Sequence, residues 1–304
     1  MGTLRRGSCG DLAGGGGRAA GLTCWGEWPH AATTTIRAGV KHRAPSVAPV
    51  NVPLVPASAS LAREVDAFLE SLDLTPPDAL SACAQWRAHE VAAHLGAGAL
   101  EIALALEAHG EGRPVPATRG FEEREAPFRA LADPDLRARL PGLLERVGSA
   151  LDAVLAVDPD AVVPWSGREM VVATFVTHLR SEFALHRFDL VGDDEIGVAL
   201  LAQPELTDHA VAVLGRALVA RGAASATAGF TAAIASRDTR DVVVVVDDDG
   251  ARLTRADGLE PAVVGDPAAR LLLLWGRQPA DPRRLTAPGG AGVLAALRSL
   301  LAGY

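Results

Sequence analysis

The sequence contains little lysine, little cysteine and few aromatic residues. Lys41 is the one lysine among 29 basic residues, and 37 acidic residues give a formal net charge of −8. An acidic chain does not attract the phosphate backbone of nucleic acids, so we expect no nucleic-acid partner. Three scattered cysteines, Cys9, Cys24 and Cys83, are too few for a disulfide framework or a cysteine-rich metal site, which favours a reducing, cytoplasmic setting.

Long uninterrupted apolar runs are also missing. A membrane-spanning helix needs about 18 or more apolar residues in succession. The longest helical apolar stretch, Val91 to Leu106, is interrupted by His94 and Glu101, so we expect no membrane segment. The hydrophobic content of 49% is instead typical of a soluble globular protein with one large or two ordinary domains.

The first 57 residues differ from the rest of the chain. They are rich in glycine and proline, carry a surplus of basic residues and show no apolar periodicity, which predicts disorder. Arg5 and Arg6 are not followed by the apolar run of a signal peptide, because Gly10 and Asp11 interrupt it. Two interpretations stay open: a disordered native leader, or a non-native segment that precedes a folded chain beginning near Ala57.

Helical periodicity begins near Ser58 and continues to about residue 220. It predicts helices over residues 58–73, 86–109, 135–157, 167–190 and 204–221, with an irregular crossover over residues 110–128. Four helices joined by one long crossover match a helix bundle. We therefore assign residues 1–57 to the leader and residues 58–220 to a bundle domain.

Beyond residue 220 the period of the sequence changes. Short strands are predicted over residues 229–235, 242–246 and 251–254, with Asp247 to Gly250 as a hairpin turn. Helices follow around Leu271 to Trp275 and over residues 292–302. The predicted fold class is therefore mainly α, with a small α/β domain over residues 221–304 after the bundle.

The fourth predicted bundle helix carries ionisable residues on its apolar face. Glu182 and His186 are four residues apart, so at about 100° per residue they differ by only about 40° around the helix. Phe175 and Leu179 share this face, which therefore points into the core. Buried ionisable groups are costly unless they are paired or bind a cation. Either a metal site or a core hydrogen bond between Glu182 and His186 meets this requirement.

The second predicted helix supplies a third candidate ligand. His94 lies at the rim of its apolar stripe, so it can face the same core as Glu182 and His186. His89 precedes it by five residues, an offset of about 140°, so the two histidines cannot share a metal as in the HExxH motif of zinc proteases. We predict that His89 is a surface residue.

These segments resemble the mycothiol-dependent maleylpyruvate isomerases and their DinB-like relatives. The similar stretches are Gln85 to Leu95, Glu182 to Asp189 and the Leu-Trp-Gly-Arg sequence that ends at Arg277. The resemblance implies a DinB-like four-helix bundle in which His94, Glu182 and His186 bind a divalent metal. The chain departs from the family pattern at residues 75–77, where Thr-Pro-Pro replaces the usual Thr-Pro-Cys and an insertion follows.

The resemblance also implies a chemistry. Two histidines and one glutamate leave coordination positions open, which is typical of a catalytic site, and they suit zinc first but also nickel, iron or manganese. Mycothiol or a similar low-molecular-weight thiol would bind there and, as thiolate, attack a small electrophilic or unsaturated acid, giving isomerisation or S-transfer. The alternative is a non-catalytic divalent-metal-binding sensor or interaction protein of the same fold.

Three further residues have predicted supporting roles. His178 is a hydrogen-bond partner of a ligand, an acid/base group, or simply a histidine at the rim of the helix face. Asp189 is expected to orient His186 or to pair with an arginine. Arg277 either recognises a substrate carboxylate or forms a salt bridge.

Overall fold

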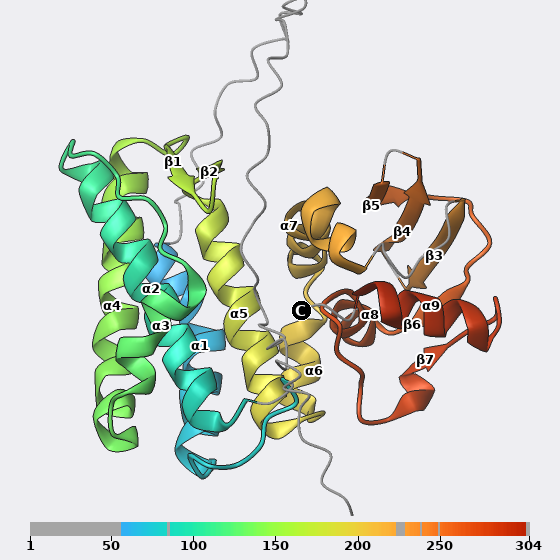
Figure 1. Ribbon diagram of the computed structural model, residues 1–304, viewed down its shortest axis with the longest axis horizontal. Coiled ribbons are helices and arrows are strands. Elements are labelled where there is room, and N and C mark those ends of the chain that lie inside the picture. The colour runs from blue at the N-terminus through green and yellow to red at the C-terminus, as the bar shows by residue number, and fades with distance from the viewer. Residues whose placement is uncertain (1–55, 84–85, 223–228, 238, 249, 302–304) are drawn as a thin grey trace, which may run out of the picture.

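The described part of the chain divides into a helical half and a half that contains a sheet (Figure 1). The computed structural model describes residues 56–83, 86–222, 229–237, 239–248 and 250–301. The predicted leader lies outside this part except for its last two residues, so its disorder stays a prediction. The chain is mainly helical with a small sheet region towards the C-terminus, which confirms the predicted fold class.

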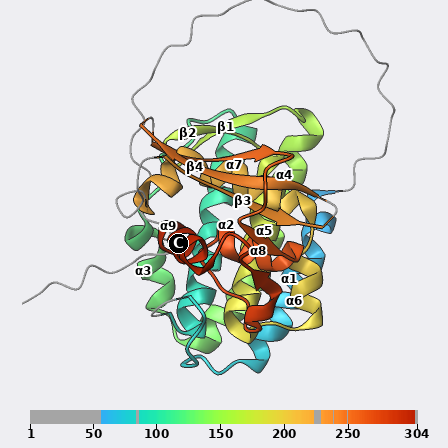
Figure 2. The same cartoon turned by 90° about the vertical axis from the view of Figure 1, so that its right-hand side faces the viewer.

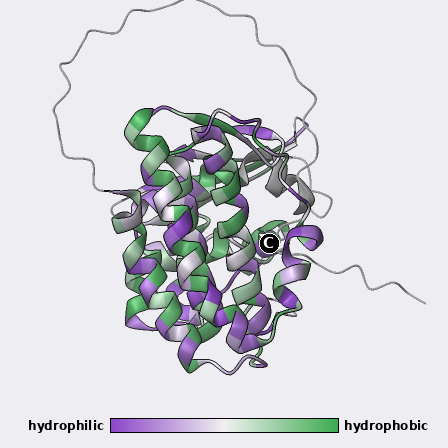
Figure 3. Cartoon of the chain, turned by 90° about the vertical axis from the view of Figure 1, so that its left-hand side faces the viewer, coloured by the Kyte–Doolittle hydropathy of each residue, from purple (hydrophilic) through white to green (hydrophobic). Residues whose placement is uncertain are grey.

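Four long helices form the bundle: α1 (Ala57–Leu74), α2 (Ala88–Gly110), α4 (Asp133–Val157) and α5 (Thr174–Val191). Helix α2 packs on α4, and α1 packs on α5 and α4. Their facing sides are apolar, and Phe68, Ile102 and Leu151 are almost completely buried. Burying each such side chain contributes roughly 1.5–3 kcal/mol, which holds the helices together. In Figure 3, hydrophilic and hydrophobic residues mix along the bundle helices, as expected of helices with one buried face.

Helix α2 is the most apolar of the bundle helices. By length and hydropathy it could cross a membrane, but 78% of its apolar 18-residue window is buried in the structure, as in the core helix of a soluble protein. Its small residues allow close packing, since a Cβ on Gly96 would lie 3.1 Å from Leu140 and 3.2 Å from Phe128. Helices α3 and α4 therefore approach α2 closely where α2 carries His94.

A short helix occupies the second half of the predicted crossover. Helix α3 spans Phe121–Arg129, so the prediction of an irregular segment over residues 110–128 is wrong for this part. Its buried residues, Phe121, Glu125 and Phe128, recur at helical spacing and pack against α2. Two turns with a strongly charged outer face give little periodic signal in the sequence, and most of their stability comes from this packing.

A β-hairpin replaces the first turns predicted for the helix over residues 167–190. Strands β1 (Val162–Trp165) and β2 (Arg168–Val171) pair antiparallel, and α5 begins after them at Thr174. The turn residues Ser166 and Gly167 have φ values of 49° and 76°. Two successive left-handed residues are typical of the tight turns that join twisted strands. The hairpin stands beside the upper end of α5 in Figure 1.

The second half is built on a five-stranded sheet with the order β5-β4-β3-β6-β7. Strands β3 and β6 run parallel, and the other neighbours are antiparallel. The valine run Val242–Val246 suits β4, an interior strand of this sheet. Figure 2 shows the sheet with α8 and α9 beside it. The elements are β3 (Phe230–Ser236), β4 (Thr239–Asp247), β5 (Gly250–Ala256), β6 (Val263–Gly265), α8 (Pro267–Leu274), a 3-10 turn (Pro282–Arg284), β7 (Leu285–Thr286) and α9 (Ala291–Leu301).

Helices α6 (Glu195–Leu201) and α7 (Pro204–Gly222) join the two halves. Helix α5 contacts both, α6 contacts α8, and α7 contacts β5 and α9. Leu185 and Phe188 of α5 belong to the same apolar core as Trp275, which is buried. The division of the chain near residue 220 stays a proposal, because α5 to α7 contribute to the core of the second half.

Candidate functional site

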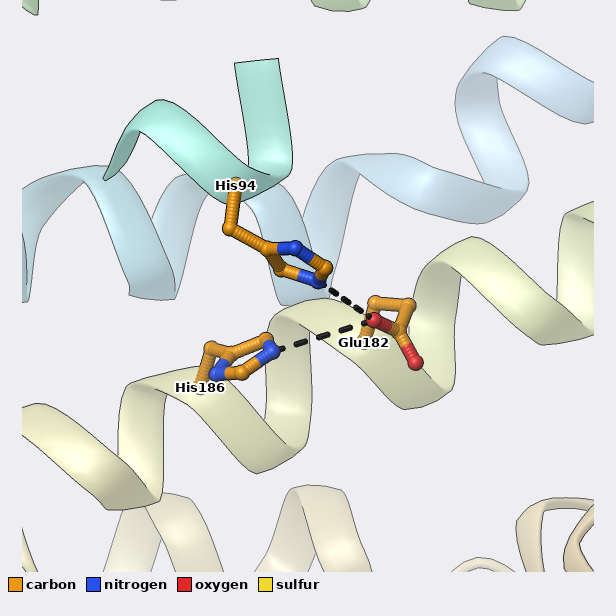
Figure 4. Close-up of side chains that lie close together, drawn as sticks. All are labelled: His94, Glu182 and His186. Carbon is orange, nitrogen blue, oxygen red and sulfur yellow. Dashed lines mark hydrogen bonds and ion pairs between the residues drawn. The ribbon is translucent and has the colours of Figure 1, made fainter. Parts of the chain in front are cut away.

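Three predicted metal ligands meet between α2 and α5. His94 comes from α2, and Glu182 and His186 come from successive turns of α5. One ligand atom of each residue lies within 4.8 Å of the other two. Glu182 Oε2 lies 3.3 Å from His94 Nε2 and 3.7 Å from His186 Nε2, so both imidazoles turn the same nitrogen towards one carboxylate oxygen (Figure 4). We call these three residues the triad.

The second nitrogen of His94 is held by a carboxylate from α3. Nδ1 of His94 lies 2.8 Å from Oε1 of Glu125, which is fully buried and 2.5 Å from Arg129 through its other oxygen. An ionised carboxylate only accepts hydrogen bonds, so His94 Nδ1 carries the proton. Nε2 faces Glu182 Oε2 at 3.3 Å, so a protonated His94 donates to Glu182 from this nitrogen, and loss of that proton leaves the Nε2 lone pair directed at the triad.

The second nitrogen of His186 is held in the same way. Its Nδ1 lies 2.8 Å from Oδ2 of Asp189, the residue that was expected to orient His186 or to pair with an arginine. Asp189 also accepts two hydrogen bonds from Arg277, at 3.0 and 2.7 Å, so the salt-bridge alternative for Arg277 is correct. Because Arg277 follows α8, this buried pair fixes α5 to the second half of the chain.

Aromatic rings lock the orientation of both imidazoles. The ring of Trp86 is stacked on His186 with a centroid distance of 6.1 Å and an interplanar angle of 19°. The ring of Phe121 is stacked on His94 at 5.3 Å and 20°. Trp86 also contacts His94 at 5.1 Å. A ring held by a hydrogen bond on one edge and by stacking on its face loses little further entropy when it binds a ligand.

Burial and neighbouring charges act against each other at the triad. Burial raises the pKa of Glu182, but the hydrogen bond from His94 and the nearby histidines outweigh it and lower that pKa to about 2. Burial lowers the pKa of His94, whereas the carboxylates of Glu125 and Glu182 raise it above 6.5. For Asp189 the burial effect is outweighed by Arg277, and the pKa lies far below its usual range. The site is thus a buried cluster of ionised carboxylates around two imidazoles.

His178 lies outside this arrangement. Its Nδ1 is 3.2 Å from Nε2 of His209 on α7, so one imidazole donates to the other. Burial lowers the pKa of both rings, in the case of His209 to about 3. The charge of Glu182 acts on His178. Its roles as a hydrogen-bond partner or acid/base group remain proposals.

A cavity of about 440 Å³ opens beside the triad. His94 and Glu182 line it, and each is almost completely buried, with exposed fractions of 4% and 6%. Three arginines also line the cavity, namely Arg119 before α3, Arg124 on α3 and Arg168 on β2. The remaining chemically relevant lining residues are His178, Ser166 and Trp165.

The sequence did not identify Glu125, Arg124 or Arg168 as site residues. Glu125 and Arg124 lie on α3, which was predicted as a loop, and Arg168 lies on β2, which was predicted as part of a helix. The spacing of Phe121, Glu125 and Phe128 is the signal that could have identified α3. His89 is directed away from the triad, and its Nδ1 lies 3.1 Å from Asp133, which keeps it partly buried and not fully at the surface.

Comparisons with known proteins find similarity in sequence over the bundle and in fold. Residues 58–191 match the family described as the mycothiol maleylpyruvate isomerase N-terminal domain. The fold is similar to the crystal structure of the mycothiol-dependent maleylpyruvate isomerase, with a TM-score of 0.51 and 17% identity over 78% of this chain and 94% of that chain. A histidine-to-alanine mutant of that isomerase gives a TM-score of 0.50 and 16% identity with the same coverage. No curated protein sequence matches the chain.

Proposed function

Because residues 58–191 belong to the family of the mycothiol maleylpyruvate isomerase N-terminal domain, we propose that the chain is a metal-dependent, thiol-using enzyme. Its reaction is the isomerisation or S-conjugation of a small unsaturated or electrophilic acid, with mycothiol as the first thiol to test. The observation that supports this proposal most strongly is the convergence of His94, Glu182 and His186 beside a cavity.

The donor set of the triad fits a divalent cation. Two imidazole nitrogens with free lone pairs and one ionised carboxylate oxygen are ligands that zinc accepts, and nickel, iron and manganese accept them as well. Glu125 and Asp189 each bind the outer nitrogen of one histidine, the arrangement that orients metal-ligating histidines in many proteins. We take zinc as the first metal to test. A cation held there would lower the pKa of a bound thiol and favour the thiolate.

The residues around the triad support the thiol chemistry by position and charge. In the isomerisation, the thiolate sulfur bonds to one alkene carbon and the π electrons move onto the conjugated carbonyl oxygen as an enolate. After rotation about the new single bond, the enolate re-forms the double bond and expels the same sulfur, so no atom is gained or lost. His178, on the cavity wall, is placed to exchange a proton with bound substrate or water. In S-conjugation, the enolate carbon takes a proton instead.

We place this reaction in the cytoplasm, where low-molecular-weight thiols stay reduced. The partners are then the thiol and the acid substrate, with no nucleic acid and no membrane. The acidic charge of the chain and the burial of α2 in the bundle support this placement.

Metal analysis of the purified full chain tests the first half of the proposal. We expect about one equivalent of divalent metal in the unmodified protein and less than about one tenth of that in His186→Ala, because removing a ligand costs more than the 10–100-fold seen for outer partners. His89→Ala is the matched control, since His89 contacts Asp133 and not the triad. Equal metal content in the His186→Ala protein and the unmodified protein would refute the site.

Turnover tests the second half of the proposal. Metal-loaded protein is incubated with maleylpyruvate or another unsaturated acid in the presence of mycothiol, and isomerised acid or thioether is measured. Thiol-dependent product that is lost in His186→Ala supports the enzyme. Full metal binding without product from any thiol and acid would favour the alternative, a non-catalytic metal-binding protein of this fold.

A further inference from the structure

One arginine in the cavity wall lacks a partner for its charge. Arg124 extends from α3 into the cavity that His94 and Glu182 also line. Among the described residues, the Arg124 guanidinium makes no hydrogen bond or ion pair, and its Nε is buried without any hydrogen-bond partner. Its guanidinium lies over the ring of Phe121, with the guanidinium carbon 4.7 Å from the ring centre.

The neighbouring arginines show that partners are available on this side of the bundle. Arg119 forms a two-pronged ion pair with Glu101, with nitrogen-to-oxygen distances of 2.9 and 2.6 Å. Arg129 binds Glu125 at 2.5 Å and also contacts Glu122. These carboxylates are therefore already engaged, and Arg124 keeps its donors free for the cavity.

An unpaired guanidinium in this position is costly. Burial lowers the pKa of Arg124, and the more distant charges of Glu125, Glu101 and Glu182 do not compensate. Arginine stays protonated in proteins. The side chain therefore remains a partly desolvated cation, which is unfavourable, and does not lose its proton. Stacking on Phe121 offsets part of this cost, since an aromatic face attracts a cation.

Basic side chains outnumber acidic ones in the cavity lining. Among the described lining residues Glu182 is acidic, whereas Arg124, Arg168 and the Glu101-paired Arg119 are basic. Arg168 approaches from the β1-β2 hairpin, and burial lowers its pKa as well. A divalent cation on the triad would increase the surplus. Such a cavity favours a ligand with at least one negative charge.

We propose that Arg124 is the specificity-determining residue of this cavity and binds a carboxylate of the acid substrate through its guanidinium. The inference rests on the proposed function, which supplies the triad as the place of reaction. A planar guanidinium matches a carboxylate with two parallel hydrogen bonds, and these fix the orientation of the ligand as well as its position. Arg124 thereby holds one end of the substrate in the cavity whose wall contains His94 and Glu182.

Calorimetric titration of the metal-loaded full chain with maleate, and with its uncharged diamide as a reference, tests the inference. We expect Arg124→Met to weaken the binding of maleate by about 10- to 100-fold, the range for loss of a charge-assisted, two-pronged contact. Binding of the diamide should change by less than about twofold, because it offers no charge to Arg124. Arg139→Met, which removes an exposed arginine of α4, is the matched control and should bind maleate as the unmodified protein does.

Two further measurements separate a binding role from a structural one. Metal content is measured in every variant, because Phe121 contacts both Arg124 and His94 and a disturbed triad would lose metal. Arg124→Lys keeps the charge and the packing stem but loses the planar fork. It should bind maleate with intermediate affinity, and it replaces Arg124→Met if that variant does not fold.

The outcomes distinguish this inference from the proposed function. Unchanged maleate affinity in Arg124→Met with full metal content would overturn the role of Arg124, as would absence of maleate binding to the unmodified protein. Maleate binding that depends on Arg124 without any thiol-dependent turnover would leave the anion site standing and reject the enzyme. If turnover has the same KM for the acid with and without Arg124, the enzyme would stand and the role of Arg124 would be rejected.

Discussion

Two histidine sites lie one turn apart on α5 and are built in opposite ways. At the triad, His94 and His186 each have Nδ1 held by a buried carboxylate, at 2.8 Å in both cases. At the second site, Nδ1 of His178 meets another imidazole, Nε2 of His209, at 3.2 Å. We call His178 and His209 the imidazole pair. His94, His186 and His209 are buried and His178 is partly buried, and the two sites differ in the hydrogen-bond partners of Nδ1.

The partners decide which charge each site accepts. Carboxylates on the outer nitrogens favour lone pairs on both inner nitrogens, and with Glu182 they make the triad a place where a cation is stabilised. At the imidazole pair burial prevails over the charge of Glu182, and it lowers the pKa of His209 to about 3. An uncharged pair of imidazoles can donate and accept a proton without binding a metal. The same residue type, eight positions apart on α5, thus supports two different chemistries.

Of the substitutions at the two histidine sites, loss of the Asp189 carboxylate should lower the free energy of unfolding most. In Asp189→Asn, Arg277 and His186 both lose an ionised partner, and Arg277 is left as a buried unpaired charge. We expect the free energy of unfolding of the metal-free protein to fall by about 3–5 kcal/mol, as for other broken buried ion pairs. Urea unfolding of the full chain measures this.

The exposed ion pair between Arg240 and Asp257 provides the control. Both side chains are more than half exposed, at 62% and 66%, so Asp257→Asn should cost about 0–1 kcal/mol. If Asp189→Asn were no more destabilising than Asp257→Asn, the buried pair would not be what fixes α5 to the second half of the chain.

Removing the other outer carboxylate should weaken the cation site with a smaller effect on folding. Glu125→Gln keeps the shape of the side chain but loses the charge that fixes the proton on His94 Nδ1. We expect zinc affinity, measured by competition with a chelator, to fall by about 10–100-fold. Glu122→Gln is the matched control, because Glu122 contacts the same Arg129 but its side chain is 71% exposed. Equal zinc affinity of the two variants would mean that Glu125 does not tune the triad.

The difference between the two sites was only partly visible in the sequence. Glu182 and His186 could be placed in the core because four-residue spacing on an amphipathic helix fixes their common face. His94 followed from its position on the stripe of α2. These inferences depend on local geometry alone, and the structure brings the three residues together.

The partners of these histidines depend on contacts between distant segments. Glu125 lies on a two-turn helix whose formation depends on packing against α2, and Arg277 lies 88 residues beyond its partner Asp189. His209 reaches His178 only because α7 folds back on α5. Helical spacing carries no information on such pairings. The hairpin over residues 162–171 was missed for a related reason, since four-residue strands leave too short a pattern to outweigh the helix that follows.

The imidazole pair should show the smallest effect at neutral pH and a distinctive dependence on pH. In His209→Gln we expect a loss of about 1 kcal/mol at pH 7, for one hydrogen bond and some packing. The unfolded chain binds a proton at this histidine below pH about 6.5. The folded chain does so only near pH 3, because burial first and then the charge of His178 lower the pKa of His209 more than Glu182 raises it. The contribution of a neutral His209 is therefore complete above pH about 6.5. It falls by up to about 1.4 kcal/mol per pH unit as the pH decreases towards 3.

Glutamine does not titrate, so the stability curves of the two proteins should cross. At pH 4.5 the unmodified protein has lost roughly 2–3 kcal/mol at this position, more than the variant lost by giving up the hydrogen bond, and His209→Gln becomes the more stable protein. All other titrating groups are common to both chains and largely cancel in the difference. Urea unfolding at several pH values between 7 and 4.5 follows the crossing. Parallel curves would mean that His209 is protonated in the folded protein near its ordinary pKa, and the imidazole pair would then be a charged site like the triad, not its uncharged counterpart.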